Sequence, residues 1–170
     1  MVDTATLTVV RDIVAILGAL IAFSYYIMTL RNQNKTRQAQ IYVQIYNRFS
    51  DPDFLERYFN SMKSEPKDFE EYMNRVTNMR ENNVREYAES ISVGMTFEGM
   101  GVLVKGGFID PQYVADTTGT LVLEYWEQKS QNYTELRNRW SNQRIYKEIE
   151  YLYDVVSEIV YREYPEMKPQ

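Results

Sequence analysis

Two residue types that carry much of enzyme chemistry are missing from this 170-residue sequence, which contains no histidine and no cysteine. Without cysteine, disulfide bonds, iron–sulfur clusters and thiol catalysis are excluded. Without histidine, the commonest general base and transition-metal ligand is absent. Any catalysis would depend on carboxylates, lysine, tyrosine, serine and threonine. We therefore predict a protein that is not an enzyme and that holds no metal ion or cofactor.

Concentrated positive charge is also lacking, since acidic residues outnumber basic ones by 24 to 19 and the net charge is −5. Nucleic-acid binding needs a basic face that neutralises phosphates, so nucleic acid is not an expected partner. The glycines of residues 98–108 (EGMGVLVKGGF) do not form a Walker phosphate loop. Lys105 is followed by glycine, whereas that loop requires serine or threonine after its lysine.

One long apolar run is present near the start of the sequence. Residues 13–30 (IVAILGALIAFSYYIMTL) carry no charge, and as a helix they would span about 27 Å, close to the thickness of the hydrocarbon core of a bilayer. A buried core helix would usually show a polar stripe, and a cleaved signal peptide would begin with a basic segment. Neither feature is present, so we predict a transmembrane helix.

The charges beside this segment predict its orientation. Arg31, Lys35 and Arg37 follow the apolar run, whereas Arg11 precedes it beside Asp12. Basic residues are retained on the cytoplasmic side of a membrane. We therefore expect a single-pass protein of the plasma membrane, with its N-terminus outside and its C-terminal domain in the cytoplasm.

Small residues follow one side of the predicted membrane helix. Ala15 and Ala19 are four residues apart, as are Gly18 and Ala22, and such spacing allows a second helix to approach closely. The row could serve self-association or a protein partner. It could equally reflect the general abundance of small residues in membrane helices.

The remainder of the sequence shows apolar residues at helical rather than alternating spacing, which predicts helices and no strands. We expect helices to start at Asp51-Pro52 and Asp110-Pro111, because aspartate caps a helix and proline suits its first turn. A further helix should run from Val84 to Lys105, with Gly106 and Gly107 ending it. Residues 64–66 read as a break between two helices.

The C-terminal part carries the clearest helical pattern. After a weak region near residues 130–131, a short helix should precede the last one, with Asn142 as its cap. The last helix presents an apolar seam at intervals of three and four residues, formed by Ile145, Ile149, Leu152, Val156 and Ile159. Such a seam suits either the core of a helical bundle or an intermolecular coiled coil.

These patterns predict an all-α protein, with one N-terminal transmembrane helix followed by a cytoplasmic multi-helix bundle. We divide the chain into residues 1–35 (the outer N-terminus and the membrane helix), 36–164 (the helical domain) and 165–170 (a polar tail). The domain is rich in tyrosine, with 15 in the whole sequence. Tyrosine suits partly buried helix faces and protein interfaces.

Glu98 is the polar residue most in need of an explanation, because it interrupts an apolar stretch (GMTFEGMGVLV). Gly94 and Gly101 share its helix face, so another backbone could approach there and bury the carboxylate. A buried carboxylate must be paired, hydrogen-bonded or protonated. We expect an ion pair with Arg48, and the alternative is a catalytic acid.

Three segments together resemble a known family: RQAQIYVQIYNRFSDPDF, then FEGMGVLVKGGFIDPQYV, then LEYWEQ. They are similar to blocks in a family of short bacterial and archaeal membrane proteins of unknown function. The resemblance extends from the apolar run to about Tyr153. It implies one N-terminal membrane helix followed by a helical domain, and it implies no catalytic activity.

The expected function is that of a membrane-anchored interaction protein, an accessory or scaffolding subunit of a larger membrane assembly. A second hypothesis is a membrane-tethered sensor whose helical domain binds a ligand, and a carboxylate-based enzyme ranks last. A pocket between the helices would favour the ligand-binding hypothesis, whereas a large apolar interface without a pocket would favour the accessory subunit.

Overall fold

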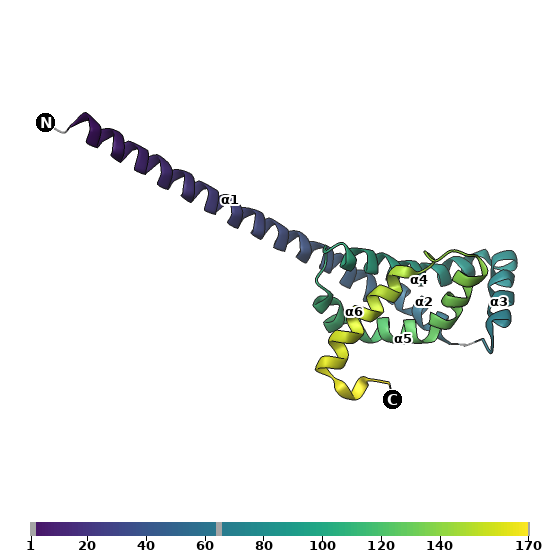
Figure 1. Cartoon of the computed structure of the whole chain (residues 1–170). Helices are drawn as coiled ribbons and strands as arrows, with labels where there is room; N and C mark the ends of the chain where they lie inside the picture. Colours follow the sequence, from purple (N-terminus) through teal and green to yellow (C-terminus); the bar gives the residue numbers. More distant parts are fainter. Residues whose placement is uncertain (1–2, 64–65, 170) are drawn as a thin grey trace. The chain divides into compact units, whose positions relative to one another are not determined.

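The computed structural model describes residues 3–63 and 66–169, and the regular structure in these ranges is entirely helical (Figure 1). The elements are α1 (Thr4–Phe49), α2 (Pro52–Met62), α3 (Phe69–Asn82), α4 (Val84–Lys105), α5 (Pro111–Arg139), α6 (Lys147–Glu163) and the 3₁₀ helix η1 (Pro165–Met167). The chain divides into two compact units, Met1–Gln40 and Ile41–Gln170. For the described residues, the predicted all-helical class is confirmed.

The first unit is the N-terminal part of α1. From Leu7 onward this helix is long and apolar enough to cross a membrane, and none of its apolar window is buried. The small residues Ala15, Gly18, Ala19 and Ala22 are all exposed on its surface. The prediction of one apolar N-terminal helix is confirmed. The membrane crossing, the plasma-membrane location and the orientation stay predictions.

Helix starts in the second unit follow the capping rule. The side chain of Asp51 accepts a hydrogen bond from the Asp53 amide at 2.9 Å, and Asp110 accepts one from the Gln112 amide at 2.9 Å. A proline follows each aspartate in the first turn. These caps satisfy amides that have no partner within the helix. Helices α2 and α5 therefore begin where the sequence predicts.

The second unit is built around α4, α5 and α6. Helix α6 packs against both α4 and α5, while α2 packs on α4, and α3 contacts α4 and α5. An aromatic cluster forms part of the core. The ring of Phe97 lies 5.3 Å from that of Phe49 and 4.7 Å from that of Tyr125, and Phe54 and Tyr58 complete the group. Burial of these large rings is the main stabilising contribution here.

The predicted apolar seam faces this core. Ile149, Leu152 and Val156 are fully buried and Ile159 is nearly so. Ile145 lies outside the helix and is half-buried in the segment before it. The seam therefore packs against helices of the same chain.

Two local predictions in the C-terminal part are wrong. No break occurs near residues 130–131, because α5 is one continuous helix of 29 residues. The buried residues Tyr133 and Leu136 continue its core-facing stripe, and tertiary packing outweighs the polar local sequence. Asn142 does not cap α6, since the residue before that helix is Tyr146 and the Asn142 side chain accepts from the Arg144 amide. The predicted break at residues 64–66 falls partly on residues 64–65, which lie outside the described ranges.

Candidate functional site

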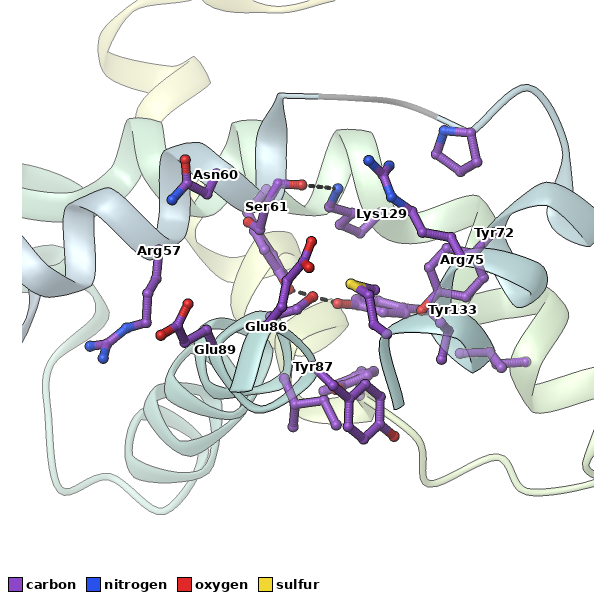
Figure 2. A pocket seen from close by; sticks show the side chains of 18 of the residues that line it. Arg57, Asn60, Ser61, Tyr72, Arg75, Glu86, Tyr87, Glu89, Lys129 and Tyr133 are labelled. Atoms are coloured by element: carbon purple, nitrogen blue, oxygen red, sulfur yellow. Dashed lines mark hydrogen bonds between the residues drawn. The ribbon is translucent and has the colours of Figure 1, made fainter. Parts of the chain in front are cut away.

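A pocket of about 690 Å³ lies within the second unit (Figure 2). Its walls are formed by side chains from α2, α3, α4 and α5, together with Ile145 and Tyr146 from the segment before α6. This volume is in the range of sites that bind small molecules and cofactors.

Aromatic side chains dominate one part of the lining. They are Tyr72, Tyr87, Tyr125, Tyr133, Trp140 and Tyr146. The hydroxyls of Tyr125 and Tyr133 are buried and lie 2.7 Å apart in a hydrogen bond, and the ring centroids of Tyr133 and Tyr146 lie 4.2 Å apart. These mutual contacts fix the rings in place, so that part of the wall is formed without a ligand.

Gly94 on α4 makes room for this aromatic wall. A Cβ atom at Gly94 would lie 3.0 Å from Cε1 of Tyr146 and 3.1 Å from the hydroxyl oxygen of Tyr125. Both distances are tighter than ordinary van der Waals contact. The glycine therefore lets two tyrosine side chains approach the helix backbone, whereas the sequence predicted the approach of another backbone here.

Four tyrosines of the pocket are held as neutral phenols. Burial raises the pKa of Tyr146 to about 12, and desolvation likewise raises the pKa of Tyr72, Tyr125 and Tyr133. A raised phenol pKa opposes ionisation, so these hydroxyls act as hydrogen-bond donors and acceptors near neutral pH. They are poorly suited to be bases or nucleophiles, which need ionised forms near the working pH.

Four basic side chains also line the pocket: Arg57, Lys63, Arg75 and Lys129. Lys129 donates to the Ser61 carbonyl oxygen at 2.7 Å (Figure 2), and Lys63 donates to Oδ1 of Asn60 at 2.8 Å. Arg57 differs from these two lysines. Its Nε and Nη2 atoms are buried and have no hydrogen-bond acceptor. A buried donor without an acceptor is costly, so this guanidinium is the least satisfied charged group of the lining.

Glu86, Glu89 and Glu98 supply the negative charge of the lining. Glu86 accepts from Nδ2 of Asn83 at 2.9 Å, and Glu89 pairs with Nε of Arg85 at 2.9 Å. Both carboxylates therefore already have donors from α4 or its cap.

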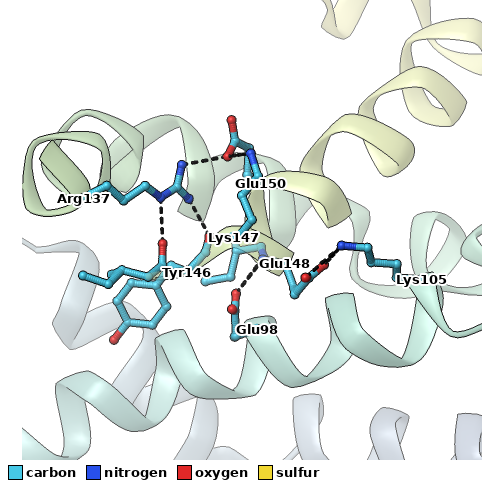
Figure 3. A network of polar contacts seen from close by, with 9 residues as sticks. Glu98, Lys105, Arg137, Tyr146, Lys147, Glu148 and Glu150 are labelled. Carbon is cyan, nitrogen blue, oxygen red and sulfur yellow. Dashed lines mark hydrogen bonds and ion pairs between the residues drawn. The ribbon is translucent and has the colours of Figure 1, made fainter. Parts of the chain in front are cut away.

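Glu98 receives its hydrogen bonds from α6 (Figure 3). Its Oε2 atom accepts from the backbone amides of Glu148 at 3.0 Å and Ile149 at 2.9 Å. These are first-turn amides of α6, whose own N-cap residue makes no side-chain cap. Glu98 thus caps a helix from a different element of the fold. Desolvation raises the pKa of this carboxyl, although the two amide hydrogen bonds act in the opposite direction.

The predicted partner of Glu98 was wrong. The guanidinium of Arg48 lies over the ring of Phe54, 5.9 Å from its centroid. The donors to Glu98 are backbone amides, and sequence spacing gives no sign of them. The predicted burial was partly right, because Glu98 is half-buried.

Gly101 explains how α6 reaches Glu98. A Cβ atom at this position would lie only 2.0 Å from the carbonyl oxygen of Glu148. Backbone contact between α4 and the first turn of α6 is therefore possible only at a glycine. Gly94 and Gly101 lie on the same face of α4 as Glu98. Gly94 makes room for the aromatic wall, and Gly101 makes room for the start of α6.

Arg137 is a structurally important residue that the sequence reasoning missed. It is 5% exposed and donates from Nε to the Ile145 carbonyl at 2.7 Å, from Nη2 to the Tyr146 carbonyl at 2.8 Å, and from Nη1 to Glu150 at 2.7 Å (Figure 3). It therefore holds the segment that carries Ile145 and Tyr146 into the pocket. One signal was available: Arg137 follows Tyr133 by four residues on the buried stripe of α5.

Substitution of Glu98 should separate its role as a cap from its charge. We expect Glu98→Ala to lower the free energy of unfolding by about 1–3 kcal/mol, because two amides lose their acceptor. Glu98→Gln keeps an acceptor oxygen and should cost less. Chemical denaturation of the full chain in mild detergent measures both.

Glu98 should also make the stability of the protein depend on pH. Because the pKa of Glu98 is raised in the folded state, its contribution to stability is greatest below its unfolded pKa and is lost as the pH rises through the folded one. Glu98→Gln should remove that slope. If Glu98→Ala leaves the free energy of unfolding unchanged, the capping role is refuted.

The structure thus defines an all-helical protein with one apolar N-terminal helix and a helical unit that contains a tyrosine-lined pocket. Among the residues it describes, no group of three or more Asp or Glu side chains is placed to hold a metal ion.

The chain belongs to the family described as domain of unknown function (DUF4760), whose sequence profile matches residues 12–155. The resemblance to a family of unknown function is therefore confirmed, while its membrane and bacterial or archaeal character stay predictions. No curated protein and no solved structure matches the chain.

Proposed function

We propose that this protein is a membrane-tethered binding protein whose helical unit holds a small molecule in the pocket. The observation that carries the proposal is the pocket of about 690 Å³. Of the two leading hypotheses from the sequence, a pocket between helices favours the sensor or regulator over the accessory subunit. Its lining combines aromatic surface with charged and hydrogen-bonding side chains, and ligand sites use such groups to orient the molecules that they bind.

The lining also supports binding in preference to catalysis. Tyr125, Tyr133 and Tyr146 are held as neutral phenols, and Glu98 is engaged by two backbone amides. A catalytic acid or base needs a pKa near the working pH and access to the substrate proton. Buried hydroxyls in a fixed hydrogen bond, such as Tyr125 and Tyr133, instead shape a surface and determine which ligands fit.

A bound molecule would contact several elements at once. The pocket is lined by Ser61 of α2, Tyr72 of α3, Ser90 of α4 and Tyr133 of α5. Binding would therefore favour one relative arrangement of these helices over others. The ring of Phe49, the last residue of α1, lies against α2 and α4 in the same core. We propose that ligand binding changes the packing around Phe49 and so alters this end of α1.

The N-terminal helix would act as the membrane anchor in this proposal, with the helical unit in the cytoplasm. Its exposed small-residue row, which includes Gly18 and Ala22, leaves open a protein partner or self-association within the bilayer. Apart from its chain neighbours and the nearby backbone of its own helix, no atom lies within 4 Å of where a Cβ of Gly18 would sit. A role as an accessory subunit stays a prediction alongside ligand binding.

Filling the pocket with a large side chain tests the proposed function. Ser90 lines the pocket from α4 and is half-buried. We expect Ser90→Trp to occupy the cavity and abolish binding of aromatic fragments that raise the unfolding temperature of the wild-type full chain. The screen is run as a thermal-shift assay in mild detergent, with fragment–micelle blanks.

Thr117→Trp is the matched control, because Thr117 is exposed on α5 and does not line the pocket. This variant should retain the response of the wild type. The proposal fails if no fragment stabilises the wild-type chain, or if Ser90→Trp and Thr117→Trp respond alike while both remain folded.

A further inference from the structure

We propose that the pocket selects amphipathic anions: molecules with a planar apolar body and one carboxylate or phosphate group, with Arg57 as the anion-binding residue. This inference rests on the proposed function and specifies the chemistry of its ligand. It rests on the hydrogen bonds of the lining: the three carboxylates accept hydrogen bonds from neighbouring groups, whereas two nitrogens of Arg57 have no acceptor.

The guanidinium of Arg57 lacks hydrogen-bond acceptors within the described part of the protein. It lies on α2, at the left of the pocket in Figure 2, and two of its three guanidinium nitrogens are buried without an acceptor. Of the described residues, none forms an ion pair with it. A guanidinium in partly desolvated surroundings attracts an oxyanion strongly, because it can offer two parallel N–H donors to a carboxylate or phosphate.

The carboxylates of the lining accept their hydrogen bonds from groups other than Arg57. Glu86 is engaged by Asn83, Glu89 by Arg85, and Glu98 by the first turn of α6. Each therefore has a local structural partner. A cationic ligand would have to compete with those donors, whereas an anionic ligand would supply acceptors that Arg57 lacks.

The aromatic wall determines the rest of the molecule. Tyr133 and Tyr146 present closely packed rings, and the hydroxyl of Tyr133 is already bonded to Tyr125. The available surface is thus mainly ring face and edge, which suits a planar apolar group. Lys129 and Arg75 lie along the upper edge of the pocket in Figure 2 and add positive potential near the site.

The test compares three probes that share one ring system: naphthaleneacetate, naphthyl phosphate and the neutral naphthaleneacetamide. Equilibrium dialysis uses the full chain in mild detergent, with protein-free micelles as the blank. The wild type should bind one or both anions at least roughly tenfold more tightly than the amide. The relative affinity of the carboxylate and the phosphate identifies the preferred oxyanion.

Arg57→Gln should weaken binding of the preferred anion by roughly 10- to 100-fold and leave amide binding unchanged. Arg57→Lys should retain part of the anion preference. Arg162→Gln is the control, since Arg162 is exposed on α6 and away from the pocket. The unfolding temperature of Arg57→Gln should match or exceed that of the wild type, which shows that lost binding is not lost folding.

Two failures are distinguishable. If the amide binds as tightly as both anions, or if Arg57→Gln leaves the preference intact, the anion inference is wrong and the pocket still binds ligands. If none of the three probes binds and no fragment stabilises the wild type, the proposed function fails with it.

Discussion

Arg137→Met should lower the free energy of unfolding by about 3–5 kcal/mol, the magnitude expected when a buried ionic network loses one member. Arg137 is the common donor to the carbonyls of Ile145 and Tyr146 and to Glu150. Methionine fills a similar volume but donates no hydrogen bond, so two carbonyls and a carboxylate lose their partner. Denaturant titration followed by tryptophan fluorescence is a suitable measurement, because Trp126 lies 5.8 Å from the guanidinium.

Arg139→Met is the matched control two residues further along the helix. Arg139 pairs with Glu70 at 2.8 Å, but both side chains are largely exposed. Exposed ion pairs contribute about 0–1 kcal/mol, so this variant should differ little from the wild type. Equal effects of the two substitutions would show that Arg137 does not hold the segment before α6.

The hydrogen bonds of Arg137 should also affect how stability depends on pH, because one of them goes to Glu150. Desolvation opposes ionisation of this carboxyl, but hydrogen bonds from Lys147 and Arg137 keep its pKa below the usual value. A lowered folded pKa stabilises the protein above the unfolded pKa, and this contribution is lost as the pH falls through the folded one. Arg137→Met should therefore reduce the loss of stability on acidification.

Gly101→Ala should destabilise the protein by about 3 kcal/mol, the upper end of the usual cost of overpacking. The added methyl group would lie 2.0 Å from the carbonyl oxygen of Glu148. That atom belongs to the backbone, so relief requires α4 and α6 to separate. Separation would also lengthen the hydrogen bonds from α6 to Glu98. Denaturation of the full chain measures the loss.

Gly99→Ala tests whether this effect is specific. Gly99 lies two residues earlier in α4. Apart from its chain neighbours and the nearby backbone of α4, no atom lies within 4 Å of where its Cβ would sit. Alanine favours helix over glycine by about 0.5–1 kcal/mol, so Gly99→Ala should be neutral or stabilising. A Gly101→Ala protein as stable as the wild type would contradict the close approach of α4 and α6.

Local sequence signals predicted much of the fold. The range Val84–Lys105 matches α4 because Asn83 caps its start and Gly106 follows its end. Aspartate–proline pairs likewise marked the starts of α2 and α5. These signals act within one or two turns of the chain, so they can be read without knowing what the helix contacts.

The errors arose where distant residues replace local signals. Helix α6 has no side-chain cap of its own and begins where Glu98, some fifty residues away in sequence, meets its first amides. Tyr146 adopts a left-handed conformation with φ of 49°, which non-glycine residues adopt infrequently. The hydrogen bond from Arg137 to the Tyr146 carbonyl helps to hold this conformation. Neither the cap by Glu98 nor the conformation of Tyr146 can be recognised from a local sequence pattern.

The pocket could not be predicted for the same reason. Its lining combines Arg57, Tyr72, Ser90 and Tyr133 from four helices with Tyr146 from a connecting segment. Abundant tyrosine indicated partly buried helix faces, but it did not show which rings would meet or leave space between them. The unsatisfied guanidinium of Arg57 is visible only once the packing around it is known.

Fluorine NMR of the full chain labelled with fluorotyrosine tests the central claim, that a small molecule occupies this pocket. Resonances are assigned by single Tyr→Phe substitutions, and the most stabilising fragment from the thermal screen is titrated in. We expect the signals of Tyr72, Tyr133 and Tyr146 to shift with a common dissociation constant. Those of Tyr113 and Tyr164, which do not line the pocket, should stay in place. Fragment binding that shifts only tyrosines outside the pocket would contradict the claim.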